Sequence, residues 1–235
     1  MQSPRVRCLL GIALLTAFAG CGGTGESEGS EKVGSGKLEI FPPEIFSGTD
    51  GTHTFKAPVI AVNYDEPVKW TIADPSIAQL APADADNEHC MITVLKTGET
   101  SVTATSGAAT FTAKLHVVPY TAQEYSDGEK RYMMGADMQN PPCKECHAPG
   151  KGPDHTSTEL DADPDSQVQN TFLTGVDPED RPIKDHSEFS ELLKGKTHKW
   201  MVTESEKVGL VAYLRGLPPM GYPPYDAPTT DKENE

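Results

Sequence analysis

The sequence has few cysteines and a shortage of positive charge, and both shortages exclude classes of protein. Only 5 of the 235 residues are cysteine. Beyond the first twenty residues, 35 acidic residues face 18 Lys and Arg (the 20 of the whole chain less Arg5 and Arg7), a net charge of −17. Such an acidic chain is a poor binder of nucleic acid or of an anionic lipid surface. Basic protein partners remain compatible with it.

Long apolar runs are also scarce. The sequence contains a single one, which lies within residues 1–20. Arg5 and Arg7 precede the run "CLLGIALLTAFA", which predicts a secretory signal too short to persist as a transmembrane helix. The following "TAFAGC" resembles the lipobox of bacterial lipoproteins. That resemblance implies export, acylation of Cys21, and a lipid anchor in a bacterial membrane, with the protein facing the periplasm or the cell surface. An ordinary signal cleaved near Ala19 or Gly20 is the alternative.

The remaining cysteines cannot form a disulfide scaffold. Cys8 leaves with the signal and Cys21 is the lipidation candidate, which leaves Cys90, Cys143 and Cys146. Residues 21–36 contain mainly Gly, Ser and charged side chains, so they cannot bury enough apolar surface to fold. We therefore expect a flexible tether there.

Residues 37–118 show the period-two alternation of β-strands. Apolar and polar side chains alternate in "VKWTI" (68–72), "ITV" (92–94), "SVTAT" (101–105) and "FTAKLHV" (111–117). Turn signals separate the runs, so the pattern predicts a β-sandwich. The stretches "VKWTIADPSIAQL", "ITVLKTGETSVTATSG" and "FTAKLHVV" resemble bacterial Ig-like group 2 domains. The resemblance implies a spacer or adhesive module.

Residues 119–225 are predicted to be helical with long loops. Capping boxes are possible at Thr121/Glu124 and Ser126/Glu129. Thr203 and Glu206 introduce the clearest helix, which Gly216 ends. Shorter helices are expected near 166–174 and 187–194, and residues 226–235 are predicted to be a disordered tail.

The stretch "CKECH" contains three chemically reactive side chains, Cys143, Cys146 and His147. C-x-x-C-H is the attachment signature of c-type haem, in which two thiols bind the porphyrin and the next imidazole can bind the iron. A zinc site would need four closed ligands, and a redox dithiol would suit a βαβ setting. Both alternatives remain open, as does a disulfide.

Residues 121–217 resemble class I c-type cytochromes in Gly128, Tyr132, "CKECH", "GP" at 152–153 and "VAYLRGL". The resemblance implies one covalent haem c held by Cys143, Cys146 and His147. It also implies that the first and last helices pack crosswise, and that the carbonyl of Pro153 accepts a hydrogen bond from the proximal imidazole.

The distal side of the iron could be occupied by His198 or Met201, both in "GKTHKWMVT". The resemblance places this ligand about five residues before the cap of the last helix, which favours His198 over Met201. His186, His155 or an open site are further alternatives. His147 and His198 are therefore the expected metal ligands.

The fold class expected from these features is multidomain, with an all-β Ig-like sandwich followed by an all-α cytochrome c domain. The expected function is one-electron transfer between a donor and an acceptor protein. No carboxylate pair or nucleophile triad is recognised, so the chain is predicted to be an electron carrier and not an enzyme by itself. Two alternatives are a haem sensor or redox-enzyme subunit with an exchangeable ligand, and an adhesive or scaffolding lipoprotein.

Overall fold

The computed structural model describes residues 36–136, 141–147, 151–186, 191–193 and 198–223. The predicted signal (1–20), the lipidation candidate Cys21, the tail (226–235) and the tether except residue 36 lie outside this range. So does most of the helix expected near 187–194. None of the helices in the described residues has the length and apolar composition needed to cross a bilayer.

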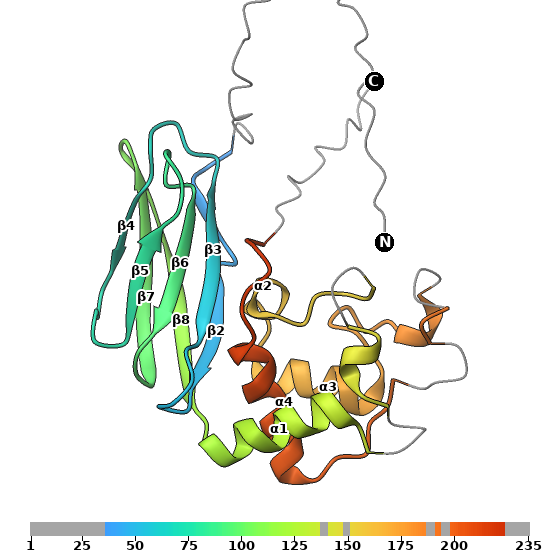
Figure 1. Cartoon of the computed structure of the whole chain (residues 1–235). Helices are drawn as coiled ribbons and strands as arrows, with labels where there is room; N and C mark the ends of the chain where they lie inside the picture. The colour runs from blue at the N-terminus through green and yellow to red at the C-terminus, as the bar shows by residue number, and fades with distance from the viewer. Residues whose placement is uncertain (1–35, 137–140, 148–150, 187–190, 194–197, 224–235) are drawn as a thin grey trace, which may run out of the picture. The chain divides into compact units, whose positions relative to one another are not determined.

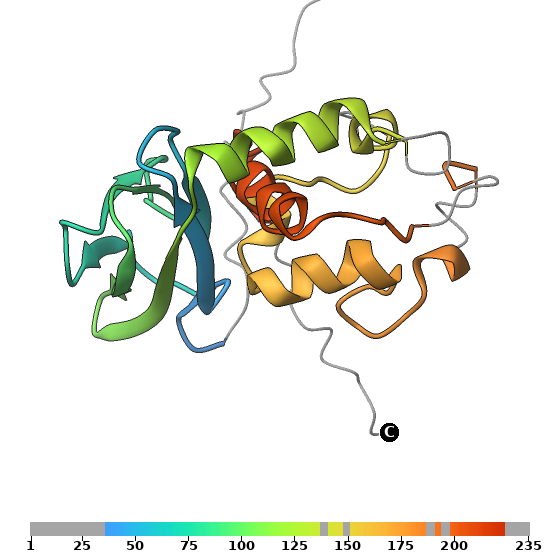
Figure 2. The ribbon, with the colours of Figure 1, turned by 90° about the horizontal axis from the view of Figure 1, so that it is seen from below.

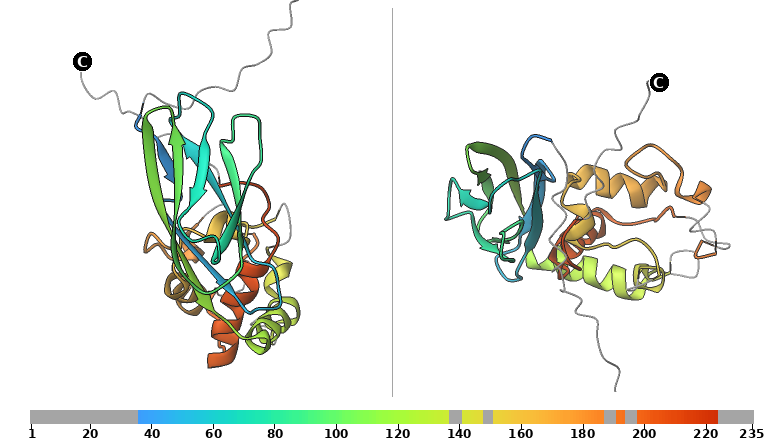
Figure 3. Two further views of the ribbon diagram at one scale, coloured as in Figure 1. Left: turned by 90° about the vertical axis from the view of Figure 1, so that its left-hand side faces the viewer. Right: turned by 90° about the horizontal axis from the view of Figure 1, so that it is seen from above.

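Eight strands in the described residues form two four-stranded sheets, which Figures 1 and 3 show as two layers. Every strand pairing is antiparallel except the parallel pairing of β2 with β8. One sheet has the order β1 (Glu39–Phe41), β3 (Lys56–Val62), β6 (His89–Val94), β5 (Ala78–Pro82). The other has the order β2 (Glu44–Thr49), β8 (Ala109–Pro119), β7 (Gly98–Ser106), β4 (Lys69–Ile72).

The predicted alternation matches four of these strands, β4, β6, β7 and β8. In β7, Val102 and Ala104 are fully buried, and they pair with Ala113 and Phe111 of β8. Such cross-strand apolar pairs stabilise one face of a sheet while the other face stays in contact with water. In β3, by contrast, every residue after Lys56 is buried, so both faces of this strand are covered.

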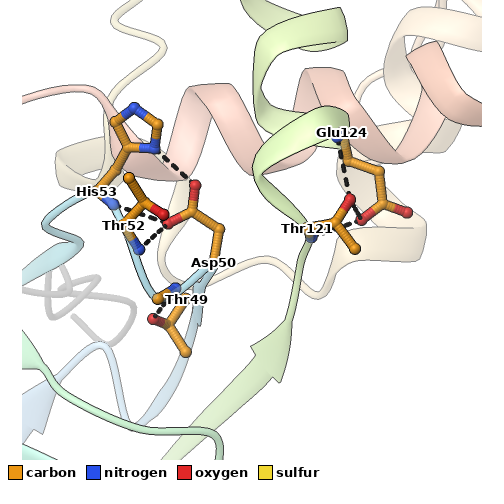
Figure 4. Close-up of polar contacts among 7 residues, drawn as sticks. Thr49, Asp50, Thr52, His53, Thr121 and Glu124 are labelled. Carbon is orange, nitrogen blue, oxygen red and sulfur yellow. Dashed lines mark hydrogen bonds and ion pairs between the residues drawn. The ribbon is translucent and has the colours of Figure 1, made fainter.

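The helical region contains α1 (Ala122–Met134), α2 (Ser157–Leu160), α3 (Asp165–Thr174) and α4 (Glu204–Gly216), with short 3₁₀ turns η1 (Cys143–Glu145) and η2 (Ile183–Asp185). The helix predicted at 166–174 is present as α3. Helix α1 begins with the predicted box at Thr121, whose hydroxyl accepts from the Glu124 N–H at 3.1 Å, as Figure 4 shows. Ser126 lies inside this helix, so the second predicted box is wrong.

Helices α1 and α4 cross in close contact (Figure 2) because each has a glycine at the crossing. A Cβ added at Gly128 would come within 1.8 Å of the Gly209 carbonyl oxygen, and one at Gly209 within 2.3 Å of the Glu124 carbonyl oxygen. Only hydrogen side chains at both positions leave room for the two backbones. The crossed pair of helices α1 and α4 is called the helical platform below, and it supports the loops of the helical region.

The predicted division into an independent β domain and an all-α cytochrome domain is wrong. The described residues belong to one compact unit, and a single cluster of buried apolar residues includes members of both the sandwich and the helices. Rings join the two regions: Phe55 of the sandwich lies 6.1 Å from Tyr125 of α1, and His53 stacks on the same tyrosine at 3.7 Å. Asp50 holds His53 in place through the ring Nδ1 at 2.6 Å (Figure 4).

A buried arginine also connects the two regions. Arg215 of α4 is 1% exposed, and its guanidinium donates to the Phe46 carbonyl of β2 at 2.7 Å and to the Asp165 carboxylate of α3 at 2.9 Å. The Phe46 N–H donates to the Asp161 carbonyl at 2.7 Å. The fold is therefore a single unit of mixed secondary structure, in which the edge strand β2 contacts α4 and strand β3 contacts α2.

Candidate functional site

A mostly apolar cavity of about 620 Å³ lies within the helical region. Four residues predicted to bind a cofactor line it, Cys143, Cys146, His147 and His198. Its walls also include aromatic and aliphatic side chains, among them Phe172, Trp200, Leu160 and Val168. The structure thus brings together residues that are 55 positions apart in the sequence.

The two cysteines and His147 lie on one tight turn. Pro142 precedes η1, and the Cys143 carbonyl accepts from the N–H groups of both Cys146 and His147, at 3.1 and 3.0 Å. This turn brings the three side chains to the same cavity. The three described cysteines, Cys90, Cys143 and Cys146, are free, so the predicted disulfide alternative does not occur.

The ring of His147 is held by a backbone carbonyl. Its Nδ1 donates to the Pro153 oxygen at 3.0 Å, a contact that the resemblance implied. Because a carbonyl only accepts, this bond leaves the proton on Nδ1 and a lone pair on Nε2. The loop needs Gly152, since a Cβ there would come within 2.6 Å of the Cys146 carbonyl oxygen.

The structure separates the two candidates for the distal position. Met201 is 85% exposed and does not line the cavity, whereas His198 lines it with its ring centroid 6.2 Å from that of His147. The Trp200 N–H donates to the Phe172 carbonyl at 2.8 Å, which attaches this segment to α3. His186 also lines the cavity, but it is bound to the Asp177 carboxylate at 2.9 Å.

Burial favours the neutral forms of His147, His198 and Cys143, three groups that line the cavity. It lowers the pKa of His147 to about 4 and the pKa of His198 below its ordinary value, because a charged imidazole loses hydration there. Burial likewise raises the pKa of the Cys143 thiol to about 11, although nearby Arg131 opposes this shift. A protonated thiol is a weak nucleophile, which argues against a reactive dithiol.

Two residues that were not among the main candidates from the sequence are brought to the site by the structure. His155 stacks on His147 with ring centroids 3.3 Å apart. Arg131 of α1 is 2% exposed; it donates to the Met201 carbonyl at 3.2 Å and lies over the Trp200 ring at 5.6 Å. The position of His155, directly after Gly152-Pro153-Asp154, was the available signal. Nothing in the local sequence marks Arg131.

The predictions of covalent haem c, of metal binding, and of a class I c-type cytochrome are corrected here. Within the described ranges, no group of three or more His, Cys, Asp or Glu side chains is placed to hold a metal ion. His147 instead directs Nδ1 to Pro153 and is covered on one face by His155. The same finding removes the zinc alternative. The C-x-x-C-H motif remains a feature of the sequence, but we do not assign it these roles.

Comparison with known proteins identifies no family. No family model matches the sequence, and no curated protein matches it. Among solved structures, domains 4 and 5 of the S-layer protein SbsC are 14% identical, with a TM-score of 0.28, covering 35% of this chain and 51% of that one. The M1 domain from titin is 10% identical, with a TM-score of 0.29, covering 36% of this chain and 95% of that one. Similarities this weak carry no functional conclusion.

Proposed function

We propose that the chain is an electron carrier that binds a flat, largely apolar redox cofactor in the cavity. Cys143, Cys146, His147 and His198 are the cofactor-binding residues of this proposal. The observation that carries it is that all four line one apolar cavity of about 620 Å³, although they come from two separate loops. Volumes of this order are typical of cofactor sites, in which a few polar groups orient a mostly apolar ligand.

The chemistry of the lining supports a carrier more than a catalyst. The lowered pKa values of His147 and His198 make both rings neutral at pH 7, so their lone pairs are available to a ligand. The raised pKa of Cys143 keeps its thiol protonated. Phe172 and Trp200 add apolar surface to the lining, and less water around a bound cofactor limits the solvent rearrangement that accompanies an electron transfer.

The proposal extends to location and partners. The signal at 1–20 and acylation of Cys21 place the protein outside the cytoplasm on a lipid anchor, and two or more acyl chains are needed for stable anchoring. A donor and an acceptor protein exchange electrons with the cofactor. The excess of acidic residues favours basic partners, whose approach an opposite charge accelerates.

The test is to purify the full chain from a bacterium that exports it and to measure three properties. These are the visible absorption spectrum, the intact mass under native and denaturing conditions, and the rate of reduction by a small-molecule donor. We expect visible absorption, a mass above that of the acylated mature polypeptide, and reversible reduction. A native mass that exceeds the denaturing mass shows that the cofactor is bound without a covalent bond.

Three variants show whether the named residues hold the cofactor. The double variant Cys143→Ser/Cys146→Ser and the variant His198→Ala should each lower cofactor occupancy. The control Met201→Leu, at a position 85% exposed, should keep wild-type occupancy. A folded, colourless wild-type protein with the mass of the acylated mature polypeptide alone would refute the proposal.

A further inference from the structure

We infer that His155 is a positioning residue that fixes the plane of the His147 ring, so that His147 presents one defined nitrogen to the cofactor. The inference rests on the proposed function, since it concerns the same cavity. The two rings are stacked with centroids 3.3 Å apart and an angle of 20° between their planes. Both residues line the cavity.

Two different constraints act on His147. The hydrogen bond from Nδ1 to the Pro153 carbonyl, 3.0 Å long, selects the tautomer and holds one edge of the ring. A single hydrogen bond does not prevent the ring from tilting about that edge. The flat face of His155 supplies the second constraint, because stacked rings resist such a tilt.

The loop around His155 is itself held firmly. The carboxylate of Asp154 accepts from the Thr156 N–H at 2.9 Å and from the Thr156 hydroxyl at 2.6 Å. Thr156 in turn caps α2, and its hydroxyl oxygen accepts from the Met220 N–H at 3.3 Å. His155 therefore lies on a short segment whose backbone is fixed on both sides.

His155 also contacts the helical platform. Its ring centroid lies 6.2 Å from that of Tyr132 of α1, a tyrosine that is 6% exposed and part of the main apolar cluster. Contacts thus run from α1 through Tyr132 and His155 to His147. A shift of the platform would be transmitted to the ring that faces the cofactor.

The hydrogen-bonding capacity of His155 does not explain its presence. Its Nδ1 is buried and has no hydrogen-bond partner among the described residues, which is unfavourable by comparison with a partnered group. A leucine would fill the same space without that cost. The property that a leucine lacks is the flat face that lies on His147.

The experiment measures the imidazole nitrogen resonances of the ¹⁵N-labelled full chain by NMR. The wild type and His155→Phe, which retains a flat face, should show His147 as a single Nδ1–H tautomer with slow proton exchange. His155→Leu should show tautomer averaging, faster exchange of the His147 Nδ1 proton, and about tenfold faster cofactor release, within the range of a lost aromatic pair. The control is His116→Leu. His116 lies on β8 with its ring stacked on Phe46, so this variant should leave the His147 signal unchanged.

A single, slowly exchanging tautomer of His147 in His155→Leu would overturn the inference, as would loss of that tautomer in His155→Phe. If His155→Leu does not fold, His155→Met replaces it, since methionine also lacks a flat face. The NMR measurement does not need the cofactor. A wild type that contains no cofactor therefore refutes the proposed function, while the tautomer of His147 still decides on the role of His155.

Discussion

At the scale of single residues, surroundings decide what each candidate can do. His198 and Met201 are three positions apart and were candidates for the same distal position, yet one lines the cavity and the other is 85% exposed. Burial gives His147, His155 and His198 lowered pKa values, because an imidazolium is poorly solvated inside the protein. These shifts connect the site to folding stability.

We expect acid to destabilise the fold through these three histidines. Their ordinary pKa is 6.5, and that of folded His147 is about 4. Below pH 6.5 the unfolded chain binds protons that the folded chain does not, so the free energy of unfolding decreases as the pH falls towards 4. Urea midpoints measured between pH 7.5 and pH 4 should show this decrease, with a smaller slope in His155→Phe. Equal slopes in the two proteins would contradict the prediction.

At the scale of elements, one contact between two helices defines the helical region. The capping boxes at Thr121 and Thr203 determine where α1 and α4 begin. Gly128 and Gly209 determine how closely they approach. The caps are local features of the sequence, whereas the glycines have their effect only when the helices meet.

The variant Gly128→Ala should be strongly destabilised. Its Cβ would lie 1.8 Å from the Gly209 carbonyl oxygen, so the helices must separate, at a cost of about 3 kcal/mol or more. Urea unfolding followed by far-ultraviolet circular dichroism measures this cost. The control Lys130→Ala, at an exposed position of the same helix, should change stability by less than about 0.5 kcal/mol. A similar small change in Gly128→Ala would show that the crossing is not close.

At the scale of the whole molecule, the sheets and the helices share one apolar cluster. Trp70 packs in the sandwich, with its indole N–H donating to the Asn87 carbonyl at 2.6 Å, and Trp200 lines the cavity. They are the two tryptophans of the chain. Each one therefore reports on a different region when the other is replaced.

We expect both regions to unfold together. In Trp200→Phe the fluorescence of Trp70 follows the sandwich, and in Trp70→Phe the fluorescence of Trp200 follows the cavity. After correction for the stability of each variant, measured by circular dichroism, each fluorescence transition should coincide with loss of secondary structure, since a shared core unfolds cooperatively. Fluorescence and circular dichroism transitions that separate in either variant would indicate two independent domains.

We expect the replacement of Arg215 to lower the free energy of unfolding more than the replacement of a charged residue on the surface. Its guanidinium bonds to Phe46, Leu160 and Asp163 carbonyls and to the Asp165 carboxylate. Replacing it with methionine leaves these acceptors without their donor inside the protein, so we expect a loss of about 3–5 kcal/mol. The control Arg181→Met, at a side chain 61% exposed, should lose less than about 1 kcal/mol in the same urea titration.

The strands and helices recognised from the sequence are those with a local pattern. Period-two alternation marked β4, β6, β7 and β8, because each has one covered face. The same rule does not detect β3, since both of its faces are buried. The β2–β8 pairing is parallel and joins residues about 70 positions apart, which no short-range pattern contains.

The sequence by itself determined the local features: the alternating strands, the capped helices, the turn that holds Cys143, Cys146 and His147, and the acidic charge. These depend on neighbours within a few residues, where backbone preferences and side-chain spacing act directly. The tertiary structure decided that sheets and helices form one unit, that His198 and not Met201 faces the cavity, and that His155 covers His147. Those outcomes depend on burial and on ring contacts between distant segments, and these exist only after the chain has packed.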